Sequence, residues 1–355
     1  MIRMIARARQ EAMLALLLSL VMTLAAGSVG LAQEASPPAD TAVTPYTPPD
    51  NAGDLSGTIE VDGSSTVGPI TEAIAEEFLA VAPDVQVPVS ISGTGGGFSR
   101  FCQGETDVQD ASRPITTEGE VPDNEALTCA ENGVEFYEFQ VATDGLAVVV
   151  NPANDFVDCL TVEELRTIWA PDSEITTWNQ VREDFPEEEI ALYGPGPDSG
   201  TFDYFTEAIV GEEGATRTDY IPSEDDNALV EGVAGDEFAL GYFGLAYVQQ
   251  NPDAVTAIGV DNGAGCVEPT PETVADGSYA PLSRPIFIYV KAESLQRPEV
   301  QEFVRFYLAT VGDLIADVGY VSSGAEIYAA EQAELEGAIA GTVPPMAPLG
   351  ATPEA

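Results

Sequence analysis

The feature that most constrains the fold is a repeated alternation between short apolar segments and segments with helical spacing. The β-branched runs TIEV (58–61) and VPVSI (87–91) are each followed by a helical pattern, and the same order returns after IALY (190–193). Such alternation is typical of α/β proteins, in which helices cover both faces of the sheets. We therefore expect an α/β fold.

Two further apolar runs indicate that this fold is divided into two lobes. Residues 140–151 form a long strand-like run interrupted by Gly145, and a second run at 283–290 returns late in the chain. Together they predict two strands that cross between the lobes. The first lobe would comprise residues 57–141 and 284–336, and the second residues 146–280.

The two ends of the chain have compositions unlike the rest. Residues 1–32 run from a basic start through an apolar stretch to small residues, which predicts a secretory signal peptide and a protein outside the cytoplasm, secreted, periplasmic or on the cell surface. The alternative is an uncleaved membrane anchor. No Cys lies near the expected cleavage point, so a lipid anchor is not expected. Residues 33–56 and 337–355 are rich in Pro, Thr and Ala, which predicts a disordered linker and a disordered tail.

The chain has four cysteines, an even number in a protein expected to be exported. This favours two disulfides over a metal site or a catalytic thiol. Three pairings are possible, and loop closure together with the division into lobes favours one pair in each lobe. The expected bonds are Cys102–Cys129 and Cys159–Cys266.

Charge and composition exclude several classes of function. Twelve basic residues against 60 acidic ones give a formal net charge of −48, which opposes binding to nucleic acid or anionic lipid. The chain has no His, so Ser-His-Asp catalysis and His-ligated zinc are excluded. Its only Lys, Lys291, is not part of a phosphate-binding loop of the G-x-x-x-x-G-K-[ST] type. We expect no metal and no cofactor.

Three clusters of Gly, Ser and Thr each follow a predicted strand and open a predicted helix. They occupy residues 62–69, 92–98 and 194–202. Free N–H groups at helix starts, together with nearby hydroxyls, can hold a small oxyanion by local donors. The long-range negative field is screened over about 8 Å at physiological ionic strength, so it does not forbid such a site. For any single cluster the alternative is an ordinary capped helix start.

One cation near these clusters would assist anion binding. Arg113, in the segment DASRPI after the second cluster, is the first candidate. Its alternative role is a structural ion pair with one of the many acidic side chains.

Taken together, the motifs resemble those of a known family. GSSTV, SGTGGGF followed by ASRPIT, DSGTFDYFTEAI, and EDDN followed by ALGYFGLAYV are similar to the phosphate-binding proteins of phosphate ABC importers, the PstS type, and to their SphX-like subgroup. The similarity spans roughly residues 57–330. It implies a type II periplasmic-binding-protein fold that closes on one inorganic phosphate and delivers it to a membrane permease. Such a protein is not an enzyme, and we expect it to act as a monomer.

The resemblance also implies a set of ligand-binding residues. The three loops would supply Ser65, Thr66 and Val67, then Thr94, and then Ser199, Gly200 and Thr201, with Ser64 and Gly95 as further candidates.

Two departures from the family pattern affect the charged positions. Pro195 stands where many members have Arg, and Arg113 stands where a well-known pattern has an Asp that accepts the phosphate proton. We therefore expect Arg113 to replace the missing cation, with Arg217 in reserve. Asp198 or Asp226 would be the proton acceptor. A buried carboxylate accepts a hydrogen bond from protonated phosphate but repels sulfate, which carries no proton at neutral pH.

Two other functions remain open from the residues alone. One is an extracellular phosphatase on the same fold, which would need a Ser or Thr nucleophile activated by carboxylates. The other is a binding protein or sensor for another oxyanion, namely sulfate, molybdate or tungstate.

Overall fold

The computed structural model describes residues 43–121, 124–197, 199–315 and 318–346. The expected signal peptide and the first part of the expected linker, residues 33–42, lie outside these ranges. Among the residues described, no helix combines the length and apolar character needed to span a membrane.

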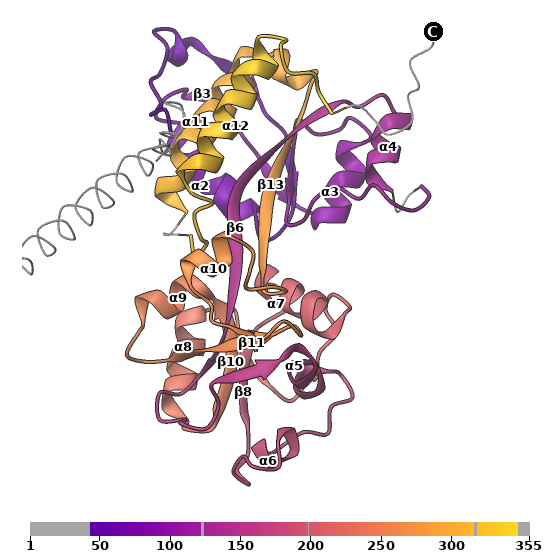
Figure 1. Ribbon diagram of the computed structural model, residues 1–355. Helices are drawn as coiled ribbons and strands as arrows, with labels where there is room; N and C mark the ends of the chain where they lie inside the picture. The colour runs from indigo at the N-terminus through magenta and orange to yellow at the C-terminus, as the bar shows by residue number, and fades with distance from the viewer. Residues whose placement is uncertain (1–42, 122–123, 198, 316–317, 347–355) are drawn as a thin grey trace, which may run out of the picture. The chain divides into compact units, whose positions relative to one another are not determined.

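Two long antiparallel strands join two α/β lobes (Figure 1). They are β6 (Phe136–Val150) and β13 (Ser283–Lys291), paired so that Arg284 lies opposite Asp144. The buried residues of β6 join the core of lobe 1 up to Ala142 and the core of lobe 2 from Leu146 onward. Burial in two successive cores explains why the apolar run in this part of the sequence is so long.

A third segment also reaches the crossing. Val321 pairs with Thr143 of β6 through two backbone hydrogen bonds of 2.9 and 3.0 Å, and its side chain packs into the core of lobe 2. The sequence predicted only two crossing strands. The difference arises because this third contact is a single bridge in a short connection, without a strand-length apolar run.

Lobe 1 is built on a sheet with the strand order β4-β2-β5-β13-β6, in which β2 runs parallel to both β4 and β5. A separate pair, β1 with β3, is also parallel. Besides β6 and β13, the elements of lobe 1 are η1 (Ala52–Asp54), β1 (Ser56–Thr58), β2 (Val61–Gly63), α2 (Gly68–Phe78), β3 (Asp84–Gln86), β4 (Val89–Ile91), α3 (Thr94–Phe101), β5 (Val108–Ala111), α4 (Glu125–Glu131), η3 (Ser294–Gln296), α11 (Pro298–Leu314) and α12 (Ala325–Ile339).

Lobe 2 continues the sheet from β6 through β10 and β8 to β9, with β10, β8 and β9 parallel. β11 pairs with β6, β7 and β12. The elements are β7 (Cys159–Thr161), α5 (Val162–Trp169), α6 (Trp178–Val181), β8 (Ala191–Pro195), α7 (Gly200–Phe205), the π-helix η2 (Thr206–Val210), β9 (Ile221–Ser223), α8 (Asp226–Gly235), β10 (Ala239–Gly244), α9 (Leu245–Gln250), β11 (Thr256–Asp261), β12 (Cys266–Val267) and α10 (Pro271–Ala275).

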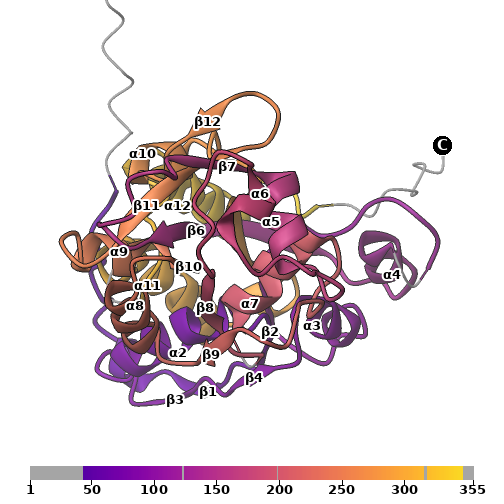
Figure 2. The ribbon, with the colours of Figure 1, turned by 90° about the horizontal axis from the view of Figure 1, so that it is seen from below.

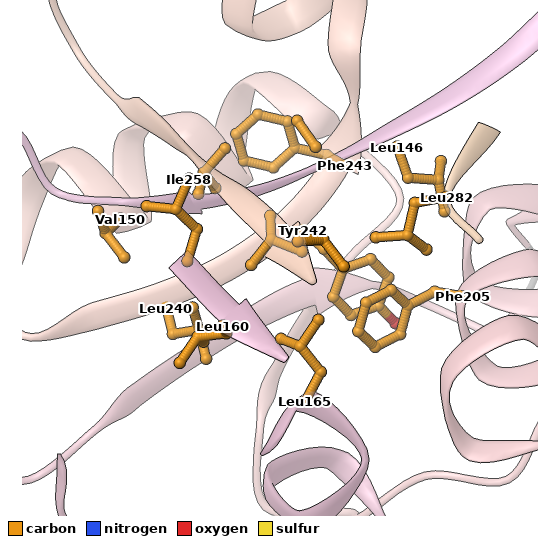
Figure 3. Close-up of a cluster of buried hydrophobic side chains, with 14 of the residues drawn as sticks. Leu146, Val150, Leu160, Leu165, Phe205, Leu240, Tyr242, Phe243, Ile258 and Leu282 are labelled. Atoms are coloured by element: carbon orange, nitrogen blue, oxygen red, sulfur yellow. The ribbon is translucent and has the colours of Figure 1, made fainter. Parts of the chain in front are cut away.

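Each lobe has its own hydrophobic core. In lobe 2, side chains from β6, β10 and β11 meet Phe205 and Leu165 of the covering helices, and the Phe205 ring stacks on Tyr242 with ring centroids 3.6 Å apart (Figure 3). In lobe 1, α11 begins with Pro298 at its first position and buries one stripe of its surface. The buried residues of this stripe, at helical spacing, are Val300, Phe303, Val304, Tyr307, Leu308 and Val311.

Both expected disulfides are present. Cys102–Cys129 joins α3 to α4 in lobe 1, and Cys159–Cys266 joins β7 to β12 in lobe 2. Each bond therefore lies within one lobe, and the crossing strands carry no cross-link.

The ends of the described chain differ from the expected linker and tail. Tyr46 packs edge-on against Phe306 with ring centroids 5.2 Å apart, and Ala52 is buried, although both lie in the segment 33–56 predicted to be disordered. At the other end, α12 continues to Ile339, and the Met346 N–H donates to the Phe136 carbonyl at 2.9 Å. Composition did not reveal these contacts because a few apolar side chains in a Pro-rich stretch suffice to dock it on a lobe. Residues 347–355 lie outside the description.

Candidate functional site

Three loops of lobe 1 leave the sheet at the same edge. β2 ends at Gly63, β4 at Ile91 and β5 at Ala111, and the three strands are parallel neighbours. Because the carboxyl ends of parallel strands meet at one edge, the residues that follow them come together there. A cavity of about 270 Å³ lies at this edge, bounded by lobe 2 on its other side.

The cavity is lined mainly by hydroxyl groups and glycine backbone from lobe 1. Six residues predicted from the sequence line it, and lobe 2 and the crossing add charged and aromatic groups. The lining residues are Ser64, Ser65, Thr66, Ser92, Gly93, Thr94, Gly95, Gly96, Ser112 and Arg113 of lobe 1, Asp203, Tyr204, Glu207 and Glu213 of lobe 2, and Arg284 of β13.

A buried carboxylate holds the first two loops together. Asp62, the middle residue of β2, accepts hydrogen bonds from the Gly63 N–H at 2.8 Å and the Ser92 N–H at 3.1 Å. Its other oxygen is paired with Arg100 of α3. The Thr66 N–H in turn donates to Ser64 Oγ at 3.0 Å. These bonds hold the backbone of both loops in one defined conformation.

The second loop passes directly into α3, which packs closely on the sheet. A Cβ at Gly97 would lie 2.6 Å from the Gly63 Cα, so only glycine permits this approach. The Thr94 hydroxyl meets Ser112 Oγ at 2.9 Å and accepts from the Ser112 N–H at 3.1 Å. The contacts between Thr94 and Ser112 thus join the second loop to the end of β5, and the close packing of α3 on the sheet places its first turn against the cavity.

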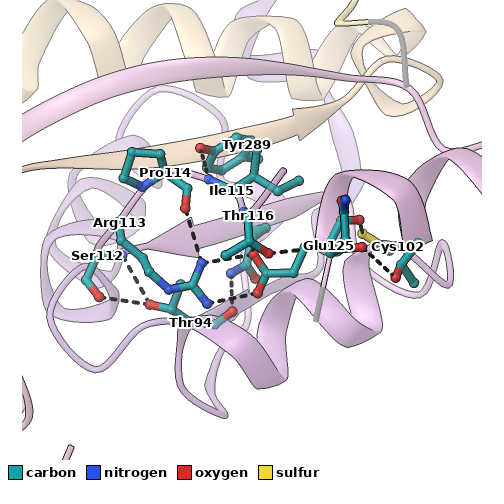
Figure 4. A network of polar contacts seen from close by, with 12 residues as sticks. Thr94, Cys102, Ser112, Arg113, Pro114, Ile115, Thr116, Glu125 and Tyr289 are labelled. Carbon is teal, nitrogen blue, oxygen red and sulfur yellow. Dashed lines mark hydrogen bonds and ion pairs between the residues drawn. The ribbon is translucent and has the colours of Figure 1, made fainter. Parts of the chain in front are cut away.

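Arg113 lines the cavity but is already engaged by an acid. Its guanidinium lies 5.8 Å from the centre of the Phe98 ring. It also makes two hydrogen bonds of 2.9 Å with the Glu125 carboxylate of α4 (Figure 4). This is the ion pair that the sequence left open as an alternative. The geometry is the bidentate one that makes Arg–carboxylate pairs strong, so much of the positive charge of Arg113 is balanced within lobe 1.

The third loop predicted from the sequence, at 194–202, belongs to lobe 2 and lies at the edge of the cavity without lining it. Ser199 caps α7 by accepting from the Thr201 N–H at 3.2 Å. Gly200 lies against the first loop of the other lobe, because a Cβ there would be 2.5 Å from Thr66 Oγ1. Figure 1 shows α7 on the side of lobe 2 that faces lobe 1, and Figure 2 shows it near β2 and α3. The lobes therefore touch at Gly200. Asp198 lies outside the described residues.

Three other predicted residues are not among those that line the cavity. Val67 is fully buried in the core of lobe 1, where it precedes α2. Arg217 is buried in lobe 2, where it pairs with Asp219 at 2.6 Å and donates to two carbonyls, Ile168 and Ile175. Asp226 begins α8 and accepts from Tyr247, and it is absent from the cavity lining. Val67 therefore packs within lobe 1, and Arg217 and Asp226 find their polar partners within lobe 2.

The charged groups that sequence reasoning missed come from α7, the segment after it and the crossing. Asp203 accepts a 3.5 Å hydrogen bond from Ser65 Oγ across the cleft. Burial and then the nearby carboxylate of Glu213 raise the pKa of Asp203 to about 6. Arg284 points at the first loop, with one guanidinium nitrogen 3.4 Å from Thr66 Oγ1.

Some of these residues carried a signal that could have been used. Asp203 lies within the motif DSGTFDYF, one turn after the loop, and Arg284 lies where the second crossing strand begins. Ser112 adjoins Arg113. Glu207 also lies in the quoted motif DSGTFDYFTEAI, whereas Glu213 is an exposed acid outside every motif, and only the folded chain brings it to the cavity.

Comparisons with known proteins agree on one family. The profile of the PBP superfamily domain matches residues 48–310. The protein SphX of Synechocystis sp. is 51% identical over 276 residues, 77% of this chain and 80% of that protein. The phosphate-binding protein PstS of Staphylococcus saprophyticus is 38% identical over 288 residues, 81% of this chain and 86% of that protein.

Solved structures support the same assignment. A possible phosphate-binding protein from Planctomyces limnophilus is 47% identical and covers 80% of this chain and 99% of its own, with a TM-score of 0.75. An ABC-type phosphate transport receptor from Vibrio cholerae is 27% identical and covers 74% of this chain and 99% of its own, with a TM-score of 0.59. This chain therefore belongs to the PBP superfamily and, within it, to the family of the SphX and PstS phosphate-binding proteins.

Proposed function

We propose that this protein is an extracytoplasmic substrate-binding protein that captures inorganic phosphate between its lobes and delivers it to an ABC importer. The observation that carries the proposal is the cavity itself, in which hydroxyl groups and glycine backbone from three parallel strand ends converge opposite lobe 2. Such donors suit an oxyanion. The names of the relatives support phosphate as the ligand, and the Vibrio receptor supports the importer as the partner.

Hydroxyls and backbone N–H groups would bind the phosphate oxygens from lobe 1. Ser65, Thr66 and Thr94 supply side-chain donors, and Gly95 and Gly96 let the backbone approach closely. No step of this proposal requires bond cleavage, so the protein would act as a carrier. We further propose that it works outside the cytoplasm, which the basic and then apolar residues 1–32 support, and that it works as a monomer.

We assign the acceptor of the phosphate proton to Asp203 instead of Asp198 or Asp226. Asp203 lines the cavity and already accepts a hydrogen bond from Ser65 Oγ across the cleft. With a pKa of about 6, it is mostly ionised at neutral pH. An ionised carboxylate accepts the proton of phosphate but repels sulfate, which has none to donate.

The first experiment is a calorimetric titration of the phosphate-stripped protein with phosphate and, separately, with sulfate. We expect one phosphate per chain and no heat from sulfate. Binding of sulfate without phosphate would move the assignment to another oxyanion, and binding of neither would refute the carrier function. Turnover of a generic phosphomonoester that disappears in Ser65→Ala would favour the phosphatase alternative.

The Asp203 assignment has its own test. Asp203→Asn should weaken phosphate binding and reduce the discrimination against sulfate, because an amide no longer repels an unprotonated anion. Asp253→Asn, at an exposed turn of lobe 2 away from the cavity, is the matched control. An unchanged ratio of phosphate to sulfate affinity in Asp203→Asn would contradict the assignment.

A further inference from the structure

Arg284 occupies a position that no motif of the family suggested. It is the second residue of β13, where that strand enters the crossing, and it lies directly opposite Asp144 of β6. Its Nε lies 3.3 Å from the buried Asp144 carboxylate. Only 14% of the Arg284 side chain is exposed. A long cationic side chain is thus held between the lobes and beside the cavity.

The guanidinium of Arg284 touches both lobes as well as the crossing. One nitrogen lies 3.4 Å from Thr66 Oγ1 in the first loop of lobe 1. The guanidinium carbon stacks 3.6 Å from the centre of the Tyr204 ring on α7 of lobe 2, and another nitrogen lies 3.9 Å from Glu207. A planar guanidinium can stack on an aromatic ring and still present N–H donors along its edge.

Arg284 is less fully engaged than the other cation of the cavity. Arg113 makes two bonds of 2.9 Å to a single carboxylate, whereas the polar contacts of Arg284 are 3.3, 3.4 and 3.9 Å long and go to three different groups. Strong charge-assisted hydrogen bonds are about 2.7–2.9 Å. Burial raises the pKa of Asp144 even though Arg284 lies beside it. The donors of Arg284 are therefore incompletely used.

We propose that Arg284 is the cation that binds the anion in the cavity, and that it holds the two lobes closed around that anion. This inference rests on the proposed function. An oxyanion beside Thr66 would give Arg284 short, charge-assisted bonds in place of its long ones. Since the same guanidinium stacks on Tyr204, the anion, the first loop and α7 of lobe 2 become linked through one side chain.

The test compares Arg284→Gln and Arg284→Lys with the wild-type protein. Phosphate affinity is measured by calorimetry, and lobe closure by the change in radius of gyration in small-angle X-ray scattering at saturating phosphate. Arg305→Gln is the matched control, because Arg305 pairs with Glu302 and Glu336 on α11 and α12, away from the cavity.

We expect Arg284→Gln to bind phosphate roughly 10- to 100-fold more weakly, as for the loss of a hydrogen bond to a charged group. It should also show a smaller phosphate-induced compaction. Arg284→Lys keeps the charge but loses the planar stack and the fork of donors, so it should bind with intermediate affinity and also compact less. Arg305→Gln should match the wild type in both measurements.

The outcomes separate this inference from the proposed function. If the wild-type protein binds no phosphate, the proposed function fails. If the wild type binds and Arg284→Gln binds equally well, only the assignment of Arg284 fails. Weaker binding with full compaction at saturation would refute its role in closure. If thermal unfolding shows that Arg284→Gln is not folded, the Arg284→Lys variant provides the test. Wild-type phosphate affinity and wild-type compaction in Arg284→Lys would refute the inference.

Discussion

The contact between the lobes at Gly200 leads to a prediction in which ligand affinity and stability change in different directions. A Cβ at this position would lie 2.5 Å from Thr66 Oγ1, 2.9 Å from the Thr66 backbone nitrogen and 3.1 Å from Ser65 Oγ. The Thr66 hydroxyl can rotate away, but its backbone nitrogen cannot. In Gly200→Ala, the lobes must therefore move apart locally or remain strained when closed.

The size of the effect follows from the cost of overpacking. One added methyl group in a closely packed contact typically costs about 1–3 kcal/mol. The strain exists only when the lobes are closed, and the proposed binding requires closure. It should therefore weaken phosphate binding by roughly 5- to 150-fold. Unfolding should not become easier, because Ala is favoured over Gly in a helix by about 0.5–1 kcal/mol and Gly200 is the first residue of α7.

The assay is calorimetric titration with phosphate, combined with thermal unfolding of the ligand-free protein. Gly235→Ala is the control, since Gly235 ends α8 and a Cβ there would have no neighbour within 4 Å. We expect wild-type affinity in the control and weaker binding, without a lower melting temperature, in Gly200→Ala. Wild-type phosphate affinity in Gly200→Ala would refute the reasoning, because binding would then not require the lobe contact seen here.

Two further predictions concern stability. Burial, with the nearby Asp62 and Glu72, raises the pKa of Asp110 to about 8. Between about pH 4 and pH 8 the folded protein therefore keeps a proton that the unfolded chain has lost. The stability of the folded state should fall as the pH rises through this range. Asp110→Asn should remove this loss, so urea unfolding should show a gain over wild type that grows with pH, and a gain independent of pH would contradict it. Removing the lobe 2 disulfide by a double Cys→Ala substitution should cost about 1 kcal/mol more than removing that of lobe 1, because the bonds span 107 and 27 residues and the longer loop restricts the unfolded chain more. Equal losses in denaturant unfolding would argue against the loop-length explanation.

Much of the fold could be predicted because it depends on local patterns. The alternation of apolar runs with helical spacing identified the α/β class, and the apolar runs around residues 140–151 and 283–290 marked the crossing strands, which pair as β6 and β13. Loop closure within each lobe favoured the disulfide pairing that the structure contains. The docking of residues 43–56 could not be predicted in this way, because it depends on where α11 and α12 leave an apolar surface.

For the candidate site, the polar loops could be predicted better than the charged groups. Ser65, Thr66 and Thr94 follow strands in recognisable motifs, and they line the cavity. Arg217 was the reserve cation expected from the sequence, yet the folded chain surrounds it with Asp219 and two carbonyls of its own lobe. The motifs did not indicate which acidic groups Arg217 would meet in the folded chain.

The sequence by itself determined the α/β class, the two-lobe organisation and the disulfide pairing, and it marked the Gly-, Ser- and Thr-rich segments 62–69 and 92–98, whose residues line the cavity. The class and the lobes follow from periodicity, the disulfide pairing from loop closure within each lobe, and the two segments from their composition at the ends of predicted strands. Only the tertiary structure decided which charges face the cavity. Asp203 and Arg284 are far apart in the chain, and each reaches the cavity because lobe 2 and the crossing strand bring it to the first loop. Electrostatic interactions act through space, so the charges that meet at the cavity are set by the packing of the lobes.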